Sequence, residues 1–168
     1  MRRRLLRDGL GPVRREASEA VSRLRLGSAF GFQELVDSVA RFRGTRLDIR
    51  AVPSLGKGEV SALWLSMRDI ELILHVDTDS ELYREQIILH ELAHMILGHD
   101  LQETGSMAQN SLLPDLPAAL IQGALARCRE RSRIELAAEV LADLLAKGLS
   151  ASRVPSGGEP LKFSEVFG

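Results

Sequence analysis

The sequence His90-Glu91-Leu92-Ala93-His94 lies near the end of a strongly apolar run, Tyr83 to Gly98. On a helix, residues four apart lie on the same face, so the two imidazoles could bind one cation. This is the His-Glu-x-x-His pattern, in which the two His bind zinc and the Glu is the general base. A polar trio in an apolar run is costly to bury unless something satisfies it, and a metal ion would. The sequence therefore predicts a zinc site on a helix.

The ends of this helix are also marked in the sequence. Asp79 or Ser80 can cap its start, because short polar side chains accept hydrogen bonds from the first free backbone N–H groups. Gly98 can end it, because glycine readily adopts the left-handed conformation of a helix C-terminus.

The elements expected around the motif helix form an α+β fold. Residues 46–52 and 70–76 alternate between apolar and polar side chains, and residues 60–67 are nearly all apolar, so three strands are predicted. Helical periodicity predicts helices over 13–26, 31–42, 116–131 and 134–149. We expect a small twisted sheet of about three strands packed against helices. The predicted organisation is a flexible basic N-terminus (1–12), a single domain (13–149) and an irregular C-terminal tail (150–168).

Composition restricts the class of protein. The chain has 168 residues, which fits one domain, and no apolar run approaches the length of a membrane span. The basic N-terminus has no apolar segment after it, so no secretion signal is predicted. The one cysteine, Cys128, allows no internal disulfide and fits a reducing compartment. We therefore expect a cytoplasmic protein that does not bind membranes.

Charge is distributed unevenly along the chain. Residues 1–50 contain 12 Arg and 6 acidic residues, whereas the rest of the chain is acidic. The first two predicted helices are not followed by a basic recognition helix. We interpret the basic third as a solvated surface and do not expect direct binding to nucleic acid.

A catalytic zinc site needs a third protein ligand. His99 lies five residues after His94, whereas the extended metalloprotease pattern has its third His six residues after the second, with Gly between. A Glu from the last helix is the better candidate. Glu139 has Asp143 one turn later on the same face, which could orient a ligating His. Glu135 has Glu139 at the same offset and remains an alternative ligand.

These residues resemble the ImmA/IrrE family of small bacterial and phage metallopeptidases, relatives of the gluzincins. The resemblance covers roughly residues 30–147. It rests on His90-Glu-Leu-Ala-His94, on Leu97-Gly98-His99, and on Glu139-x-x-Ala142-Asp143-x-x-Ala146. The family's second motif is similar to Glu-x-Glu-Ala-Asn/Asp-x-Phe-Ala. Here Leu141 and Leu145 replace its second Glu and its Phe, and the spacing between the two motifs is longer.

The resemblance implies a zincin-like fold and a zinc-dependent endopeptidase that cleaves a protein partner, a DNA-binding transcriptional repressor or other regulator. Zinc would be bound by His90, His94 and Glu139, and Glu91 would be the general base. The oxyanion formed during hydrolysis needs a donor besides zinc. Tyr83, His75 and His99 are the candidates, although His75 is expected to be a half-exposed strand residue.

A second class of function is also compatible with the sequence. The protein could be a non-catalytic metal-binding interaction protein, such as a toxin–antitoxin or repressor partner. The basic N-terminal third and the helix predicted over 116–131 would then be its docking surfaces.

Overall fold

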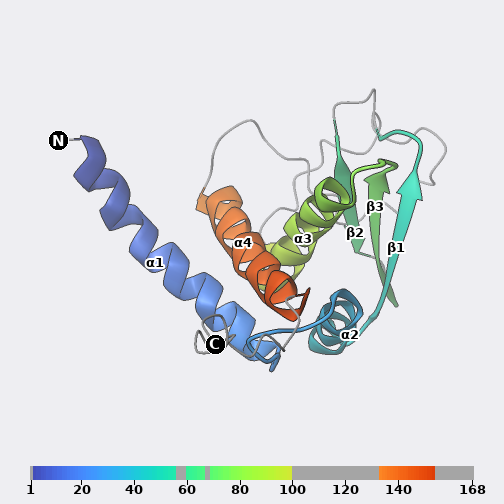
Figure 1. Ribbon diagram of the computed structural model, residues 1–168, viewed down its shortest axis with the longest axis horizontal. Helices are drawn as coiled ribbons and strands as arrows, with labels where there is room; N and C mark the ends of the chain where they lie inside the picture. Colours follow the sequence, from blue (N-terminus) through green and yellow to red (C-terminus); the bar gives the residue numbers. More distant parts are fainter. Residues whose placement is uncertain (1, 56–59, 67–68, 100–132, 154–168) are drawn as a thin grey trace, which may run out of the picture.

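A computed structural model describes residues 2–55, 60–66, 69–99 and 133–153, with side chains from Leu10 onward. In chain order the elements are α1 (Arg2–Arg23), α2 (Phe32–Arg43), β1 (Arg46–Val52), β2 (Ala62–Ser66), β3 (Ile70–Val76), α3 (Glu81–Leu97) and α4 (Arg133–Arg153). Figure 1 shows the sheet on one side of α3 and α4 on the other. The predicted α+β class, with helices packed on a small sheet of three strands, is confirmed.

The three strands form a mixed sheet with β3 in the centre, in the order β1-β3-β2. β1 pairs with β3 in parallel, with Ile49 opposite Ile73, and β2 pairs with β3 in antiparallel, with Trp64 opposite Ile73. Successive residues of a strand point to opposite faces. Trp64 and Ile73 join the main core with the helices, whereas Leu63, Leu65 and Leu74 form a second buried cluster on the other face.

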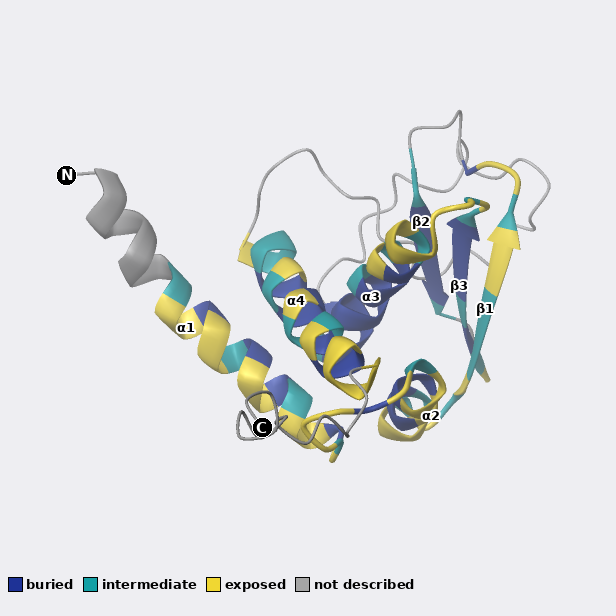
Figure 2. Cartoon of the chain, in the orientation of Figure 1, coloured by how far each residue is buried: buried dark blue, intermediate teal, exposed yellow. Residues whose placement is uncertain are grey.

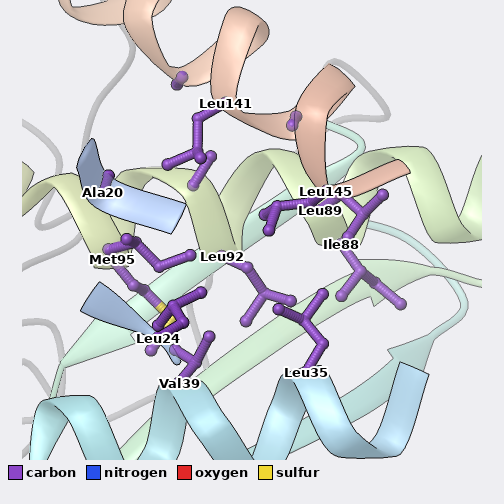
Figure 3. Close-up of a cluster of buried hydrophobic side chains, with 14 of the residues drawn as sticks. Ala20, Leu24, Leu35, Val39, Ile88, Leu89, Leu92, Met95, Leu141 and Leu145 are labelled. Atoms are coloured by element: carbon purple, nitrogen blue, oxygen red, sulfur yellow. The ribbon is translucent and has the colours of Figure 1, made fainter. Parts of the chain in front are cut away.

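The main core lies around α3, whose C-terminal half is almost entirely buried (Figure 2). Figure 3 shows side chains of α1, α2 and α4 converging on it. The contributing residues include Ala20, Leu24, Leu35, Val39, Ile88, Leu89, Leu92, Met95, Leu141 and Leu145. Most of the stability of a helix in a protein comes from tertiary packing, so these core contacts hold the motif helix in place.

The predicted ends of the motif helix are confirmed. Ser80 is its N-cap, and the Ser80 hydroxyl accepts a hydrogen bond from the Tyr83 backbone N–H at 3.2 Å. Gly98 ends the helix with φ of +70°, and its N–H donates to the Met95 carbonyl at 3.2 Å. Both ends follow from local chemistry, because a serine hydroxyl and a glycine backbone satisfy groups that the helix itself leaves unpaired.

Three elements differ from their predicted bounds. α1 extends from Arg2 to Arg23, so it includes residues of the segment 1–12 that was expected to form a flexible N-terminus. Arg and Leu are good helix formers, and Pro12 lies inside the helix without ending it. β2 begins at Ala62, two residues after the start of the predicted strand over 60–67, and α4 extends to Arg153, four residues beyond the prediction. The helix predicted over 116–131 and Cys128 lie outside the described residues.

A glycine allows α4 to approach the α1–α2 connection closely. A Cβ atom added at Gly148 would lie 2.3 Å from the Phe30 ring, closer than atoms can approach without rearrangement. Phe30 is 4 % exposed, and its backbone N–H donates to the Gly148 carbonyl at 3.4 Å. The absence of a side chain at Gly148 therefore lets Phe30 anchor the connection on α4.

A buried charged cluster connects the sheet to the helices. Glu71 of β3 is 2 % exposed, and one of its carboxylate oxygens accepts hydrogen bonds from Arg43 Nε at 3.1 Å and Nη2 at 2.8 Å. Its other oxygen accepts the Trp64 indole N–H at 2.7 Å. The Arg43 guanidinium also lies 5.3 Å from the centre of the Trp64 ring. Because α2, β2 and β3 each contribute one member, the cluster fixes their relative positions.

We expect Arg43→Ala to lower the free energy of unfolding by about 3–5 kcal/mol, because it leaves a buried carboxylate without its cation. Urea denaturation measures this change. Arg41→Ala, an exposed position on the same helix, is the control and should change stability by less than about 0.5 kcal/mol. A similar small change for both variants would show that the cluster contributes little to stability.

Among the described residues, no helix combines the length and apolarity required to cross a membrane.

Candidate metal centre

His90 and His94 lie one turn apart on α3, and their side chains point to the same place. Their Nε2 atoms are 3.1 Å apart. The His94 side chain is 2 % exposed and that of His90 is 19 % exposed, so the pair lies where the buried part of the helix meets solvent. Two nitrogen atoms at this distance need a proton or a cation between them.

The third member of the group comes from the start of α4. Glu135 Oε2 lies 3.3 Å from His90 Nε2, and Glu135 Oε1 lies 3.5 Å from His94 Nε2. His90, His94 and Glu135 form a group that could hold a metal ion, with donor atoms within 4.8 Å of one another. Imidazole nitrogen with carboxylate oxygen is a donor set that transition metals accept.

The packing of α4 on α3 explains why Glu135 reaches the histidines. Ala138 and Ala142 follow Glu135 by three and seven residues and therefore lie on its side of the helix. Both are buried, and their small side chains allow the two helices to approach closely. Leu141 and Leu145, which are fully buried in the main core, fix the rotation of α4.

The structure does not bring Glu139 into this group. Glu139 and Asp143 are exposed on α4, one and two turns beyond Glu135. Both line a groove of about 330 Å³ between α3 and α4 that begins at His90. The sequence offered two carboxylates as candidates for the third ligand, with Glu139 as the first choice. The geometry favours the alternative, Glu135. Among the described residues, no hydrogen bond or ion pair joins Asp143 to either of the histidines that it was expected to orient.

His99 is placed behind the metal-binding pair. Its Nδ1 lies 2.7 Å from His94 Nδ1, on the opposite side of the imidazole from the nitrogen that faces His90. His99 is 4 % exposed. The left-handed turn at Gly98 folds the chain back, so His99 can contact His94 although it follows the end of α3. This role could not be deduced from spacing, because it depends on the direction of the chain after the helix.

The other two candidate donors lie elsewhere in this structure. Tyr83 is 41 % exposed, and its hydroxyl is hydrogen-bonded to the Ser61 hydroxyl at 2.8 Å. His75 is 5 % exposed, which corrects the expectation of a half-exposed residue. It shares the face of β3 with Ile73, which is the face that the helices cover. Its Nδ1 lies 2.9 Å from the Val76 carbonyl, and it is not a member of the metal-binding group.

Glu91 is 1 % exposed and adjoins His90 on α3. The candidate centre thus combines a three-donor group, a buried carboxylate at the next position of α3, a buried imidazole behind one donor, and a groove that His90 lines. Comparison with protein-family models, with curated proteins and with solved structures finds no match to this chain. The resemblance to the ImmA/IrrE peptidases therefore rests on the motif residues themselves.

Proposed function

We propose that the protein is a zinc-dependent endopeptidase with a zincin-like site, which hydrolyses a peptide bond in a protein partner. The observation that carries the proposal is the meeting of two helices at one point. The His-Glu-x-x-His sequence lies on α3, and Glu135 of α4 completes a three-donor group beside an open groove. Two His and one Glu are the ligands of several zinc peptidases.

The distances within the group support zinc as the metal. Ligand atoms at 2.0–2.2 Å from a tetrahedral ion lie roughly 3.3–3.6 Å from one another. The Nε2 atoms of His90 and His94 are 3.1 Å apart, and they lie 3.3 Å from Oε2 and 3.5 Å from Oε1 of Glu135, respectively, which is close to this range.

The chain's own residues then have distinct roles in hydrolysis. When bound, zinc would supply Lewis acidity, which lowers the pKa of water toward neutrality. Glu91 would accept a proton from the attacking water and donate it to the leaving amine. Its burial excludes bulk water from this carboxylate. The groove beside His90 would position the peptide.

The class of substrate follows from the resemblance stated above. We propose a cytoplasmic regulatory peptidase whose partner is a DNA-binding repressor or another regulator, with no direct contact between the peptidase and nucleic acid. The alternative, a metal-binding interaction protein that does not cleave, differs in one measurable respect. It would bind zinc and the partner but release no peptide fragments.

Removal of the metal tests the proposed function. The purified protein would be incubated with a degenerate peptide library as isolated, after chelation, and after zinc is restored, with cleavage followed by mass spectrometry. We expect cleavage as isolated, its loss after chelation, and its recovery with zinc. Zinc binding without cleavage of either the library or a co-purifying partner would favour the non-catalytic alternative, and cleavage resistant to chelation would contradict a metallopeptidase.

His99 provides a second prediction. If His94 binds a metal through Nε2, its proton lies on Nδ1 and is donated to His99 Nδ1. Partners of this kind orient a ligand, and their loss typically weakens metal affinity by about 10- to 100-fold. We expect this loss for His99→Ala, measured by competition with a chromophoric chelator. His99→Gln retains an acceptor oxygen and should recover part of the affinity, whereas equal affinities in all three proteins would exclude a positioning role.

A further inference from the structure

The groove between α3 and α4 has an apolar floor. Leu82 and Leu89 of α3 and Ala142 and Ala146 of α4 line it, and His90 lies at its edge. Its volume of about 330 Å³ falls at the lower end of ligand pockets, which suits one long side chain better than a large ligand. The groove is lined by His90, which is a member of the metal-binding group. A substrate side chain in the groove would therefore belong to a residue next to the reacting bond.

One side of the groove is negatively charged. Glu139 and Asp143 lie one turn apart on α4, and both are exposed. Among the described residues, neither carboxylate has an ion-pair partner within 4.0 Å. Two carboxylates without such a partner in the described part of the chain make this wall of the groove complementary to a cation.

The third acidic residue of the groove is already neutralised. Glu85 is 9 % exposed, and both of its oxygens contact the Arg153 guanidinium. The hydrogen bond and the charge of Glu85 raise the pKa of Arg153. This ion pair joins the second turn of α3 to the last turn of α4 and leaves Glu139 and Asp143 as the carboxylates available to a ligand.

We infer that this groove is a subsite for an arginine or lysine side chain of a peptide, adjacent to the bond that the metal centre hydrolyses. The aliphatic part of such a side chain would cover the leucine and alanine floor, and its cationic end would meet Glu139 and Asp143. The inference names the class of substrate for the proposed peptidase. Its statement about cleavage rests on the proposed function, whereas its statement about binding does not. Binding can be tested separately.

The test uses the Glu91→Gln protein loaded with zinc, in which hydrolysis of the peptide is expected to be slow compared with a binding measurement. Two fluorescent ten-residue peptides of alanine, glycine and leucine would be compared, one with a central arginine and one with citrulline, which has nearly the same shape but no charge. We expect the arginine peptide to bind about five-fold more tightly, since two exposed carboxylates each contribute modestly. The preference should decrease as salt is raised.

Variants assign the preference to the groove. Glu139→Gln combined with Asp143→Asn should abolish the difference between the two peptides without lowering the affinity for the citrulline peptide. Glu19→Gln, which removes an exposed carboxylate from α1, should leave the difference unchanged. Circular dichroism and zinc content would verify that each variant is folded and loaded.

The possible failures are distinguishable. Equal binding of both peptides, or no binding of either, would overturn the subsite while leaving cleavage by the wild-type protein as an independent test of the peptidase. A carboxylate-dependent preference for arginine in a protein whose wild type never cleaves would retain the subsite and overturn the proposed function. If the wild type does cleave, its cleavage sites should lie next to arginine or lysine.

Discussion

Peptide hydrolysis by the Glu91→Gln protein should be about 10²- to 10⁴-fold slower than by the wild type, with zinc content unchanged. This is the usual contribution of a positioned general base. Glutamine has nearly the same size as glutamate but cannot accept a proton at neutral pH. Because Glu91 is 1 % exposed and next to His90, no solvent-exposed carboxylate could readily take its place. The measurement is kcat together with elemental analysis of the same preparation.

A matched control lies on the same helix. Glu81 is exposed in the first turn of α3, and Glu81→Gln should retain both zinc and activity. Hydrolysis at the wild-type rate by the Glu91→Gln protein would exclude Glu91 as the base. Loss of zinc from this variant would instead indicate that Glu91 helps to hold the metal-binding side chains in place.

Much of the fold could be predicted because its signals are local. The Ser80 cap, the Gly98 end and the alternation of β1 and β3 each depend on residues within a few positions of one another. The packing of the sheet was harder to predict. Glu71 occupies a strand position that alternation assigns to a polar face, yet it is buried because Arg43 and Trp64, distant in sequence, satisfy both of its oxygens.

The candidate site was predictable on α3 and ambiguous on α4. The His pair is determined by helical spacing alone. On α4 the same pattern occurs twice, four residues apart. Glu135 is followed by Ala138, Glu139 and Ala142, and Glu139 is followed by Ala142, Asp143 and Ala146.

Each of the two carboxylates is followed by a second acid one turn later and by alanines at the same offsets. α4 could therefore pack on α3 in two registers, which differ by one turn of helix. Local sequence does not determine how far α4 is displaced along α3. That displacement depends on the packing of Leu141 and Leu145 in the core and on the close contact between Gly148 and Phe30. Tertiary packing therefore brings Glu135, and not Glu139, into the group with the histidines, whereas sequence spacing could only propose both residues.

Zinc content of Glu135→Ala and Glu139→Ala should decide between the two registers. We expect Glu135→Ala to lose the metal, with a decrease in affinity that exceeds the roughly 10- to 100-fold effect of removing an outer-shell partner. Glu139→Ala should retain roughly one zinc per chain, because its carboxylate lines the groove and not the three-donor group. Elemental analysis after dialysis measures both, and thermal denaturation verifies folding.

The opposite result, with zinc lost only from Glu139→Ala, would mean that α4 lies one turn away from its position in this structure. The groove carboxylates would then be ligands, and the arginine subsite would have to be abandoned as well. Loss of zinc from both variants would indicate that the second carboxylate supports the first. In that case Glu139 would support the ligand Glu135 in the way that Asp143 was expected to support Glu139. Both registers allow this, because in each of them an acid follows the ligand by one turn.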